Sequence, residues 1–318
     1  MGLASRLYRG ETEFPLIRRR KTFYIVSIVF VVVCLASMIF RGFNVGEEFK
    51  GGATFRWAAN GVSIVDARST IEGLGVANPT VQTVGLAGGG KDLLVTTGPL
   101  TQDKITQVID GISAKYKIDK NAIGESDVGA SWGKQVTNKA LQGLVLFLIA
   151  VIIYISIRFE PKMAVAAIVA LIHDLILTAG IYSITQFVVT PATVIALLTV
   201  LGYSLYDTIV VFDKVEENTR GLAGRSTQTY SEAAELAVNQ TFMRSINTSL
   251  IALLPVSGLL FVGAFLLGAG TLKDLALALF VGLASGAYSS LFLATPLLAD
   301  LKEREPQYKA LQQRVLAR

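Results

Sequence analysis

The sequence contains very few of the side chains that form disulfides and metal centres. Its 318 residues include one cysteine, Cys34, and one histidine, His173. A lone cysteine cannot close a disulfide within the chain, and cysteine or histidine metal sites need several such ligands. We therefore expect no disulfide framework, no metal site and no bound cofactor.

Charged residues are scarce as well. They make up 17% of the chain, against about 25% in typical soluble domains. Apolar residues account for 52%, a proportion that excludes a wholly soluble protein. The formal net charge is +5, but the basic residues gather at the ends of apolar runs. We therefore expect contact with membrane lipids and no nucleic-acid partner.

Six apolar runs are long enough to cross a bilayer of about 30 Å, which takes roughly 20 apolar residues in a helix. Only helices and closed barrels satisfy their backbone in lipid, and these runs are too long for barrel strands. We place the six spans at residues 22–40, 140–157, 163–185, 192–212, 245–267 and 272–298. The last five form one bundle over residues 138–300.

Lysine and arginine flank these spans on one side of the membrane. They precede the first span, separate the second from the third and the fourth from the fifth, and follow the sixth. Because such residues concentrate on the cytoplasmic side, we place the N-terminal segment 1–21 and the C-terminal tail 301–318 in the cytosol. The first span follows a basic leader as a signal peptide does, but its length and the lack of a cleavage site favour an uncleaved anchor.

The long external segment, residues 41–137, has its own pattern of elements. Strands are predicted near 53–57, 80–85, 92–97 and 122–128, and helices near 63–73 and 101–116. The order βαββαβ is that of the ferredoxin-like fold. The predicted fold class is therefore an α-helical membrane protein with six transmembrane helices and one small α+β ferredoxin-like external domain. Gly51 and Gly52 precede its first strand and permit a hinge or turn with positive φ.

The central stretch of the chain is 190–218, with the sequence TPATVIALLTVLGYSLYDTIVVFDKVEEN. Thr190 is placed to cap a helix, and Pro191 suits its first turn. Asp207 lies about two turns before the apolar run ends, where a carboxylate costs a few kcal/mol unless it faces protein or water. At helical spacing it shares a stripe with other polar or small residues, namely Thr199, Gly202, Tyr203 and Tyr206.

A second buried acid is predicted in the middle of the third span. Asp174 follows His173 and shares a helix face with Thr178 and Tyr182. A His–Asp pair at this depth is a candidate for a functional site. The alternative is a hydrogen bond that holds two helices together.

Arg244 opens the fifth span at about the depth of Asp207, so we predict an ion pair between them. Arginine would stabilise the ionised carboxylate and desolvation the neutral form, so protonation could switch the pair. A static pair that fixes helix register is the alternative. Asp213 lies at the helix end, where Lys214, Arg244 or water would satisfy it.

Three further features concern the later spans. A polar cytosolic loop containing an amphipathic helix is predicted between the fourth and fifth spans, at residues 213–244. Pro255 predicts a kink in the fifth span. Small residues at 282–286 predict close helix packing in the sixth.

Four segments together resemble the SecD/SecF family of protein-export membrane proteins, part of the resistance-nodulation-division (RND) superfamily. They are GYSLYDTIVVFDKVEEN at 202–218, the Phe-x-Gly-Gly motif within 45–52, ALIHD at 170–174 and VNQTFMRSINTS at 238–249. The resemblance runs from the first span to the sixth. It implies a six-helix RND-type half with one external domain.

The resemblance also implies a role in protein export across the bacterial cytoplasmic membrane. With SecD, the SecYEG channel and SecA as partners, such a subunit uses the proton gradient to promote late steps in the transport of an unfolded preprotein. Asp207 matches the proton-relay aspartate of the family and Arg244 its basic partner, while Asp213 belongs to the same motif. His173 and Asp174 complete the predicted relay. No catalytic residue is predicted, so we expect no enzyme.

The chain departs from the family pattern at three places. Glu47 and Glu48 stand where Ile-Asp is usual, and Ala130 stands where proline is common. Tyr206 replaces a usual asparagine beside Asp207, which leaves open the hydrogen bonding of that acid. The first two departures concern the hinge of the external domain.

Two other functions fit the same features. One is an exporter subunit of the RND superfamily that moves small molecules or lipids, although such exporters have two large external domains. The other is a structural subunit that stabilises a channel complex without a proton role. Drug susceptibility of a deletion strain tests the first, and a double substitution of Asp207 and Arg244 tests the second.

Overall fold

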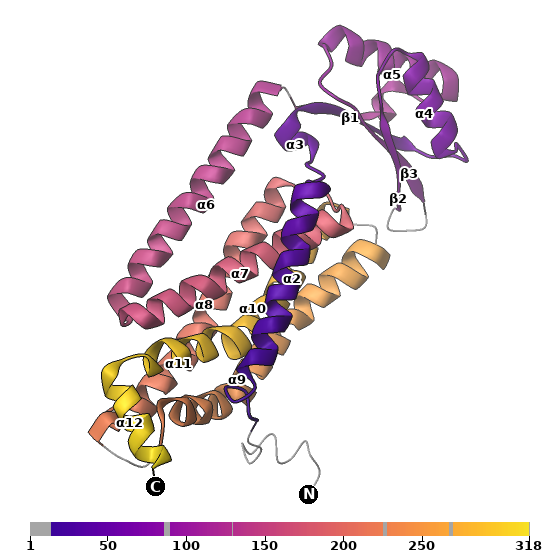
Figure 1. Cartoon of the computed structure of the whole chain (residues 1–318). Helices are drawn as coiled ribbons and strands as arrows, with labels where there is room; N and C mark the ends of the chain where they lie inside the picture. Colours follow the sequence, from indigo (N-terminus) through magenta and orange to yellow (C-terminus); the bar gives the residue numbers. More distant parts are fainter. Residues whose placement is uncertain (1–13, 86–89, 129, 225–227, 267–269, 318) are drawn as a thin grey trace, which may run out of the picture.

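Long helices run side by side, and a small α+β domain stands at one end of them (Figure 1). The computed structural model describes residues 14–85, 90–128, 130–224, 228–266 and 270–317. The C-terminal helix α12 (Pro306–Leu316) lies at the end of the bundle opposite the α+β domain.

Six of the described helical segments are long and apolar enough to cross a membrane, as the sequence predicts. The first three are α2 (Arg20–Phe40), α6 (Ala130–Arg158) and α7 (Pro161–Thr185). The fourth is α8 (Pro191–Thr219). The fifth is α9 (Tyr230–Ser257), continued by the π-helix η3 (Gly258–Leu266). The sixth is α10 (Gly270–Ser289), continued by the π-helix η4 (Ser290–Ala294) and by α11 (Thr295–Glu303).

Local sequence explains where these helices begin. Proline occupies the first turn of α7 and of α8, where its missing N–H is harmless. Thr190 caps α8 and forms a capping box with Thr193. Pro255 lies inside α9, and three residues later the helix changes from the α to the π type. A proline removes one backbone hydrogen bond, and this change of helix type lies next to the residue at which the sequence predicts a kink.

The α+β domain has the predicted βαββαβ order. Its elements are β1 (Gly52–Ala58), α4 (Ile64–Gly73), β2 (Thr80–Gly85), β3 (Lys91–Thr96), α5 (Gln102–Tyr116) and β4 (Gly124–Val128), with a short 3-10 turn η1 (Lys120–Ala122) before β4. The strands form an antiparallel sheet in the order β2-β3-β1-β4. Its core holds inward residues of the sheet, such as Phe55 and Leu93, and of the two helices, such as Ile71 and Val108. This is the ferredoxin-like arrangement expected from the sequence.

The α+β domain is connected to the bundle by the segment that follows α2. Residues 45–52 form the short helix α3 (Glu47–Lys50) and then enter β1. Val45 pairs with Val189, and the Gly46 N–H donates to the Val189 carbonyl at 2.9 Å. Gly51 has φ of +77°, the conformation predicted for this turn, and Gly52 begins β1.

The second span begins earlier than the sequence suggested. The external segment was expected to extend to residue 137 and the span to begin at 140, but α6 starts at Ala130. Gly133 allows α6 to pack closely against α3, because a Cβ atom there would lie 2.7 Å from the Phe49 carbonyl oxygen. Position 130 therefore belongs to the helix, and Gly129 lies outside the described residues.

The predicted cytosolic loop 213–244 is much shorter in the structure. Helix α8 continues to Thr219, and α9 begins at Tyr230 behind a capping box of Thr229 and Glu232. The short turn η2 (Leu222–Gly224) lies between them. Polar composition suggested a loop, but these residues extend two membrane helices beyond the apolar zone.

The described parts of both predicted terminal segments pack against the bundle. Leu16 and Ile17 are buried, and the Asn239 side chain exchanges two hydrogen bonds with the Phe14 backbone at 2.7 and 3.0 Å. At the other end, Leu311 of α12 is fully buried. The C-terminal segment is therefore part of the fold.

Candidate functional site

Two aspartates are buried inside the helical bundle. Asp174 on α7 is 1% exposed, and Asp207 on α8 is 4% exposed. Carboxylates within membrane spans are rare and face the interior of the protein. Their environments therefore decide what the bundle can do chemically.

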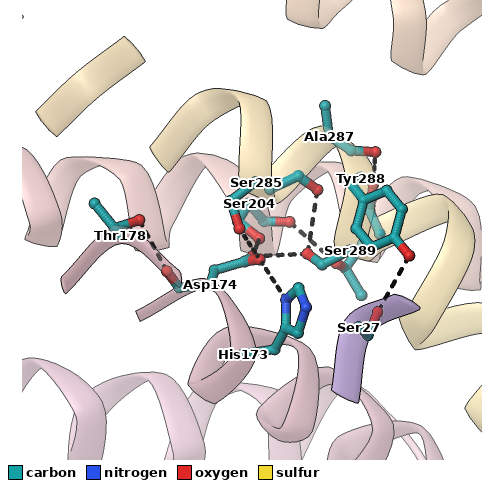
Figure 2. Close-up of polar contacts among 12 residues, drawn as sticks. Ser27, His173, Asp174, Thr178, Ser204, Ser285, Ala287, Tyr288 and Ser289 are labelled. Carbon is teal, nitrogen blue, oxygen red and sulfur yellow. Dashed lines mark hydrogen bonds and ion pairs between the residues drawn. The ribbon is translucent and has the colours of Figure 1, made fainter. Parts of the chain in front are cut away.

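Asp174 is surrounded by serine hydroxyls (Figure 2). Ser204 of α8 donates to its carboxylate at 2.6 Å, and Ser285 and Ser289 of α10 each donate at 2.7 Å. All three serines are buried. The acid thus joins three helices through neutral donors.

His173 lies beside this carboxylate. Its Nδ1 atom is 3.2 Å from Asp174 Oδ1, and its ring stacks on Tyr288 with centroids 6.1 Å apart. Tyr288 in turn meets the Ser27 hydroxyl of α2 at 3.2 Å. The Nε2 atom of His173 is buried and has no hydrogen-bond partner among the described residues. The structure thus places the predicted His–Asp pair in contact.

Asp207 is held by two serines of other segments. Ser245 of α9 donates to it at 2.8 Å, and Ser290 of η4 donates to its other oxygen. Within the described part of the chain, no lysine or arginine nitrogen lies within 4.0 Å of this carboxylate. Asp207 therefore links α8, α9 and η4 without a counter-charge.

The predicted ion pair between Asp207 and Arg244 is absent from this structure. Arg244 is exposed, and its guanidinium points to the Tyr206 hydroxyl at 3.4 Å. Arg244 does lie close to Asp207 along the bundle, since it contacts the neighbouring Tyr206. The side chain that contacts Asp207, however, is that of the next residue, Ser245. Tyr206, the departure from the family pattern, therefore contacts Arg244 and leaves the hydrogen bonds of Asp207 to serines.

The predicted polar stripe on α8 is also only partly correct. Tyr206 is 51% exposed, and Thr199 and Gly202 are exposed too. The buried face that carries Asp207 contains Ala196, Val200, Ser204, Thr208 and Val211 instead. Tyr203 is half-buried, one turn before Asp207, and its hydroxyl has no hydrogen-bond partner among the described residues.

Small residues on α10 allow it to pack close enough to α8 for these contacts. A Cβ atom on Gly282 would lie 2.5 Å from Val200 Cγ1, and one on Gly286 would lie 2.9 Å from Ser204 Cβ. Close packing was predicted for residues 282–286, and the structure confirms it. The same segment also supplies Ser285 to Asp174, a polar role that the sequence analysis did not assign.

The change to a π-helix occurs where α10 reaches the two acids. Ser289 is the last residue of α10 and Ser290 the first of η4. Single π turns inside α-helices are frequent at functional sites. Here the π-helix η4 begins at two consecutive serines that bond to different aspartates, Ser289 to Asp174 and Ser290 to Asp207.

Asp213 lies away from this centre. Its carboxylate accepts a hydrogen bond from Arg158 at 2.7 Å, and both side chains are about half exposed. Lys214 and Arg244 were the predicted partners, but Lys214 pairs with Glu217 at 2.8 Å. Arg158 ends the second span, so the pair joins α6 to α8.

The serines that hold the two acids were not predicted as site residues: Ser204, Ser245, Ser285, Ser289 and Ser290. A signal was present, because Ser285 and Ser289 are four residues apart and so share a helix face. Serine also serves as a small packing residue in membrane helices, which hid this role. Among the described residues, no three His, Cys, Asp or Glu side chains group as a metal site would require.

Comparisons with known proteins agree with this architecture. Residues 108–304 match the family described as protein export membrane protein SecD/SecF, C-terminal. A protein translocase subunit SecF of Streptomyces coelicolor is 47% identical over 317 residues, covering 99% of this chain and 84% of that protein. The SecF of Mycobacterium tuberculosis H37Rv is 45% identical over 322 residues, covering 99% of this chain and 73% of that one.

Solved structures show the same fold. The crystal structure of SecDF, a translocon-associated membrane protein from Thermus thermophilus, matches 96% of this chain with a TM-score of 0.80 and 28% identity. SecDF in its super-membrane-facing form matches 95% with a TM-score of 0.68 and 28% identity. This chain spans 40% of the length of each of those SecDF chains. The sequence identity over nearly the whole chain and the shared six-helix fold lead to one conclusion: this chain belongs to the SecD/SecF family of protein-export membrane proteins.

Proposed function

We propose that this chain acts as the SecF subunit of a protein-export complex and that, together with SecD, it uses the proton gradient to promote late steps of export. The observation that carries the proposal is the environment of Asp207. This carboxylate is buried among membrane helices and is held only by hydroxyl groups within the described part of the chain.

Proton binding at Asp207 would change the contacts between helices. Hydrogen bonds to an ionised carboxylate are roughly twice as strong as those between neutral groups. When Asp207 takes up a proton, its bonds to Ser245 and Ser290 weaken, and α9 and η4 are held less tightly to α8. Proton uptake and release thus become a movement of helices.

The proton gradient can drive such a change. One elementary charge that crosses 100 mV is worth about 2.3 kcal/mol. That energy is enough to shift an equilibrium between two packings by more than tenfold, since about 1.4 kcal/mol corresponds to a factor of ten.

The relatives support a partner for this chain. A SecDF of Bacillus subtilis is 33% identical over 290 residues, and this chain covers 38% of it. That proportion supports SecD as the companion half. We extend the proposal to the SecYEG channel, SecA and the unfolded preprotein, in the bacterial cytoplasmic membrane, with both termini in the cytosol as the basic residues indicate.

The remaining predicted relay residues keep a place in this proposal. Arg244 precedes Ser245 on α9 and is exposed at the surface that carries Tyr206. Asp213 lies nearly two turns beyond Asp207 on α8, beside Arg158. We assign Asp213 a place on the proton path between Asp207 and the cytoplasmic side, and Arg244, whose guanidinium stays charged, the role of a fixed positive charge beside that path.

The test is Asp207→Asn in the complex of this chain with its SecD partner. We expect loss of the proton-gradient stimulation of export of a secretory protein into vesicles, with basal export retained. Asp103→Asn is the matched control, because Asp103 is an exposed aspartate of the external domain. Equal stimulation in the Asp207→Asn and unmodified complexes would refute the proton role.

A further inference from the structure

We propose that Asp174 is a second proton-binding carboxylate and that it acts on the same π-helical turn as Asp207. This inference rests on the proposed proton-driven function and adds a second acid to it. It assigns a role to the serine-lined site on α7, α8 and α10 (Figure 2).

The ligands of Asp174 suit both protonation states. A serine hydroxyl can donate to a carboxylate, and it can also accept a hydrogen bond from a carboxylic acid. An arginine or lysine partner could donate a hydrogen bond but could not accept one. With Ser204, Ser285 and Ser289 around it, Asp174 can be hydrogen-bonded both as a carboxylate and as a carboxylic acid.

The charged groups around Asp174 also favour proton binding there. Within the described part of the chain, no lysine or arginine nitrogen lies within 4.0 Å of it. The titratable group in contact with it is His173 of its own helix; Tyr288 of α10 stacks on His173, and Asp207 of α8 bonds to Ser290, the neighbour of Ser289. From α2 the neighbouring polar group is Ser27, which is not titratable. Asp174 therefore has no fixed positive partner among the described lysines and arginines, and a proton would neutralise its charge.

His173 argues against a purely structural role. A pair that served only to fix two helices would be expected to satisfy its buried polar atoms. Instead, Nε2 of His173 is buried and lacks a hydrogen-bond partner in the described residues, while Nδ1 faces Asp174 at 3.2 Å. The unpartnered Nε2 atom therefore favours a functional role for the pair.

Ser289 and Ser290 connect this site to Asp207. They are consecutive, and they lie at the junction of α10 and the π-helix η4. A proton on Asp174 weakens the bond to Ser289, and a proton on Asp207 weakens the bond to Ser290. Each event loosens the same turn, so the two acids bias one movement of the sixth span.

The experiment is a pH titration by infrared spectroscopy of the purified complex with its SecD partner in lipid vesicles. The observable is the carbonyl band of protonated carboxylic acids. We expect two pH-dependent bands, one removed by Asp174→Asn and the other by Asp207→Asn. In Ser289→Ala, the midpoint of the Asp174 band should move upward by about one to two pH units, because one donor to the ionised carboxylate is lost.

Ser183→Ala is the matched control. Ser183 is a fully buried serine of α7 whose hydroxyl donates to the Gly42 carbonyl at 2.8 Å, far from both acids along the helix. Its substitution should leave both midpoints unchanged. Ser289→Ala keeps both carboxylates, so it can be titrated even where Asp174→Asn fails to fold.

Two results would overturn the inference. One is a spectrum in which no pH-dependent carboxyl band depends on Asp174. The other is a Ser289→Ala titration identical to the unmodified protein. Either result alongside a loss of proton-stimulated export in Asp207→Asn would reject the second site and leave the proposed function intact. Retained stimulation in Asp207→Asn would instead reject the proposed function itself.

Discussion

Asp174 and Asp207 lie on different helices but bond to adjacent residues of the same turn. Asp174 accepts from Ser289 and Asp207 from Ser290, where the sixth span changes from α-helix to π-helix. Neither carboxylate has a lysine or arginine nitrogen within 4.0 Å in the described part of the chain. The hydrogen bonds of two buried acids thus meet in one local irregularity of the backbone.

Removing the serines that hold Asp207 should impair the proton-dependent step. We expect Ser245→Ala and Ser290→Ala each to reduce proton-stimulated export several-fold, because a hydrogen bond to an ionised group is worth about 1.5–3 kcal/mol. The measurement is export into vesicles with and without an imposed gradient. Ser183→Ala, which alters a buried serine without an aspartate partner, should behave like the unmodified protein. Equal stimulation in all variants would contradict the assignment.

Much of this architecture was predictable from the sequence, because lipid imposes long apolar runs and an antiparallel domain imposes alternating strands. The six spans, the βαββαβ order and the positive φ of Gly51 all follow from such local rules. The ends of the helices were harder to predict, because α8 and α9 extend into the polar sequence between residues 213 and 244.

The contacts of the acids were not predictable in the same way. Depth in the membrane suggested Arg244 as the partner of Asp207, but rotation about the helix axis decides which neighbour meets the acid. On α9 that rotation presents Ser245 inward and Arg244 outward. The π-helical turn at Ser290 likewise depends on tertiary packing, for which the sequence carries no plain signal.

Close packing between α8 and α10 should be sensitive to a single methyl group. Gly282→Ala would place a Cβ atom 2.5 Å from Val200 Cγ1, and we expect destabilisation of about 1–3 kcal/mol from overpacking. Gly143→Ala on α6 is the control, because a Cβ atom there meets no atom within 4 Å of the described structure. That change should be neutral or stabilise by up to about 1 kcal/mol, since alanine favours helix.

Thermal unfolding of the two purified glycine variants provides the comparison. Proton-stimulated export should fall in Gly282→Ala as well, because Gly282 shares its helix with Ser285, Ser289 and their contacts to Asp174. A Gly282→Ala protein that unfolds at the same temperature as Gly143→Ala would show that the two helices are not closely packed in the membrane.

The turn between α3 and β1 should depend on glycine at position 51. Its φ of +77° is strained for any residue with a Cβ atom, at a cost of about 1–2 kcal/mol. We expect Gly51→Ala to increase hydrogen exchange in α3 and at the start of β1. Gly73→Ala, at a position with ordinary φ and open space around it, should leave exchange there unchanged. Unchanged exchange in Gly51→Ala would exclude a hinge at this turn.

The α+β domain should lose one stabilising contact on acidification. Asp66 of α4 accepts hydrogen bonds from Lys115 and from the Tyr116 hydroxyl, both at 3.0 Å. These bonds hold the pKa of Asp66 below its usual value of 3.8, the larger effect coming from Lys115. A lowered pKa of an acid means that its contribution to stability is present above the unfolded-state pKa and disappears as the pH falls through the folded-state pKa.

Asp66→Asn should therefore weaken the docking of α5 on α4 at neutral pH and have no effect once the pH lies below the folded-state pKa of Asp66. Hydrogen exchange of the α5 segment in the full-length protein, compared between the variant and the unmodified chain across this range, is the measurement. Asp103→Asn, which removes an exposed charge from the first turn of the same helix α5, is the control. A difference between Asp66→Asn and the unmodified chain that persists unchanged at the acidic end would mean that the carboxylate does not act through its ionised form.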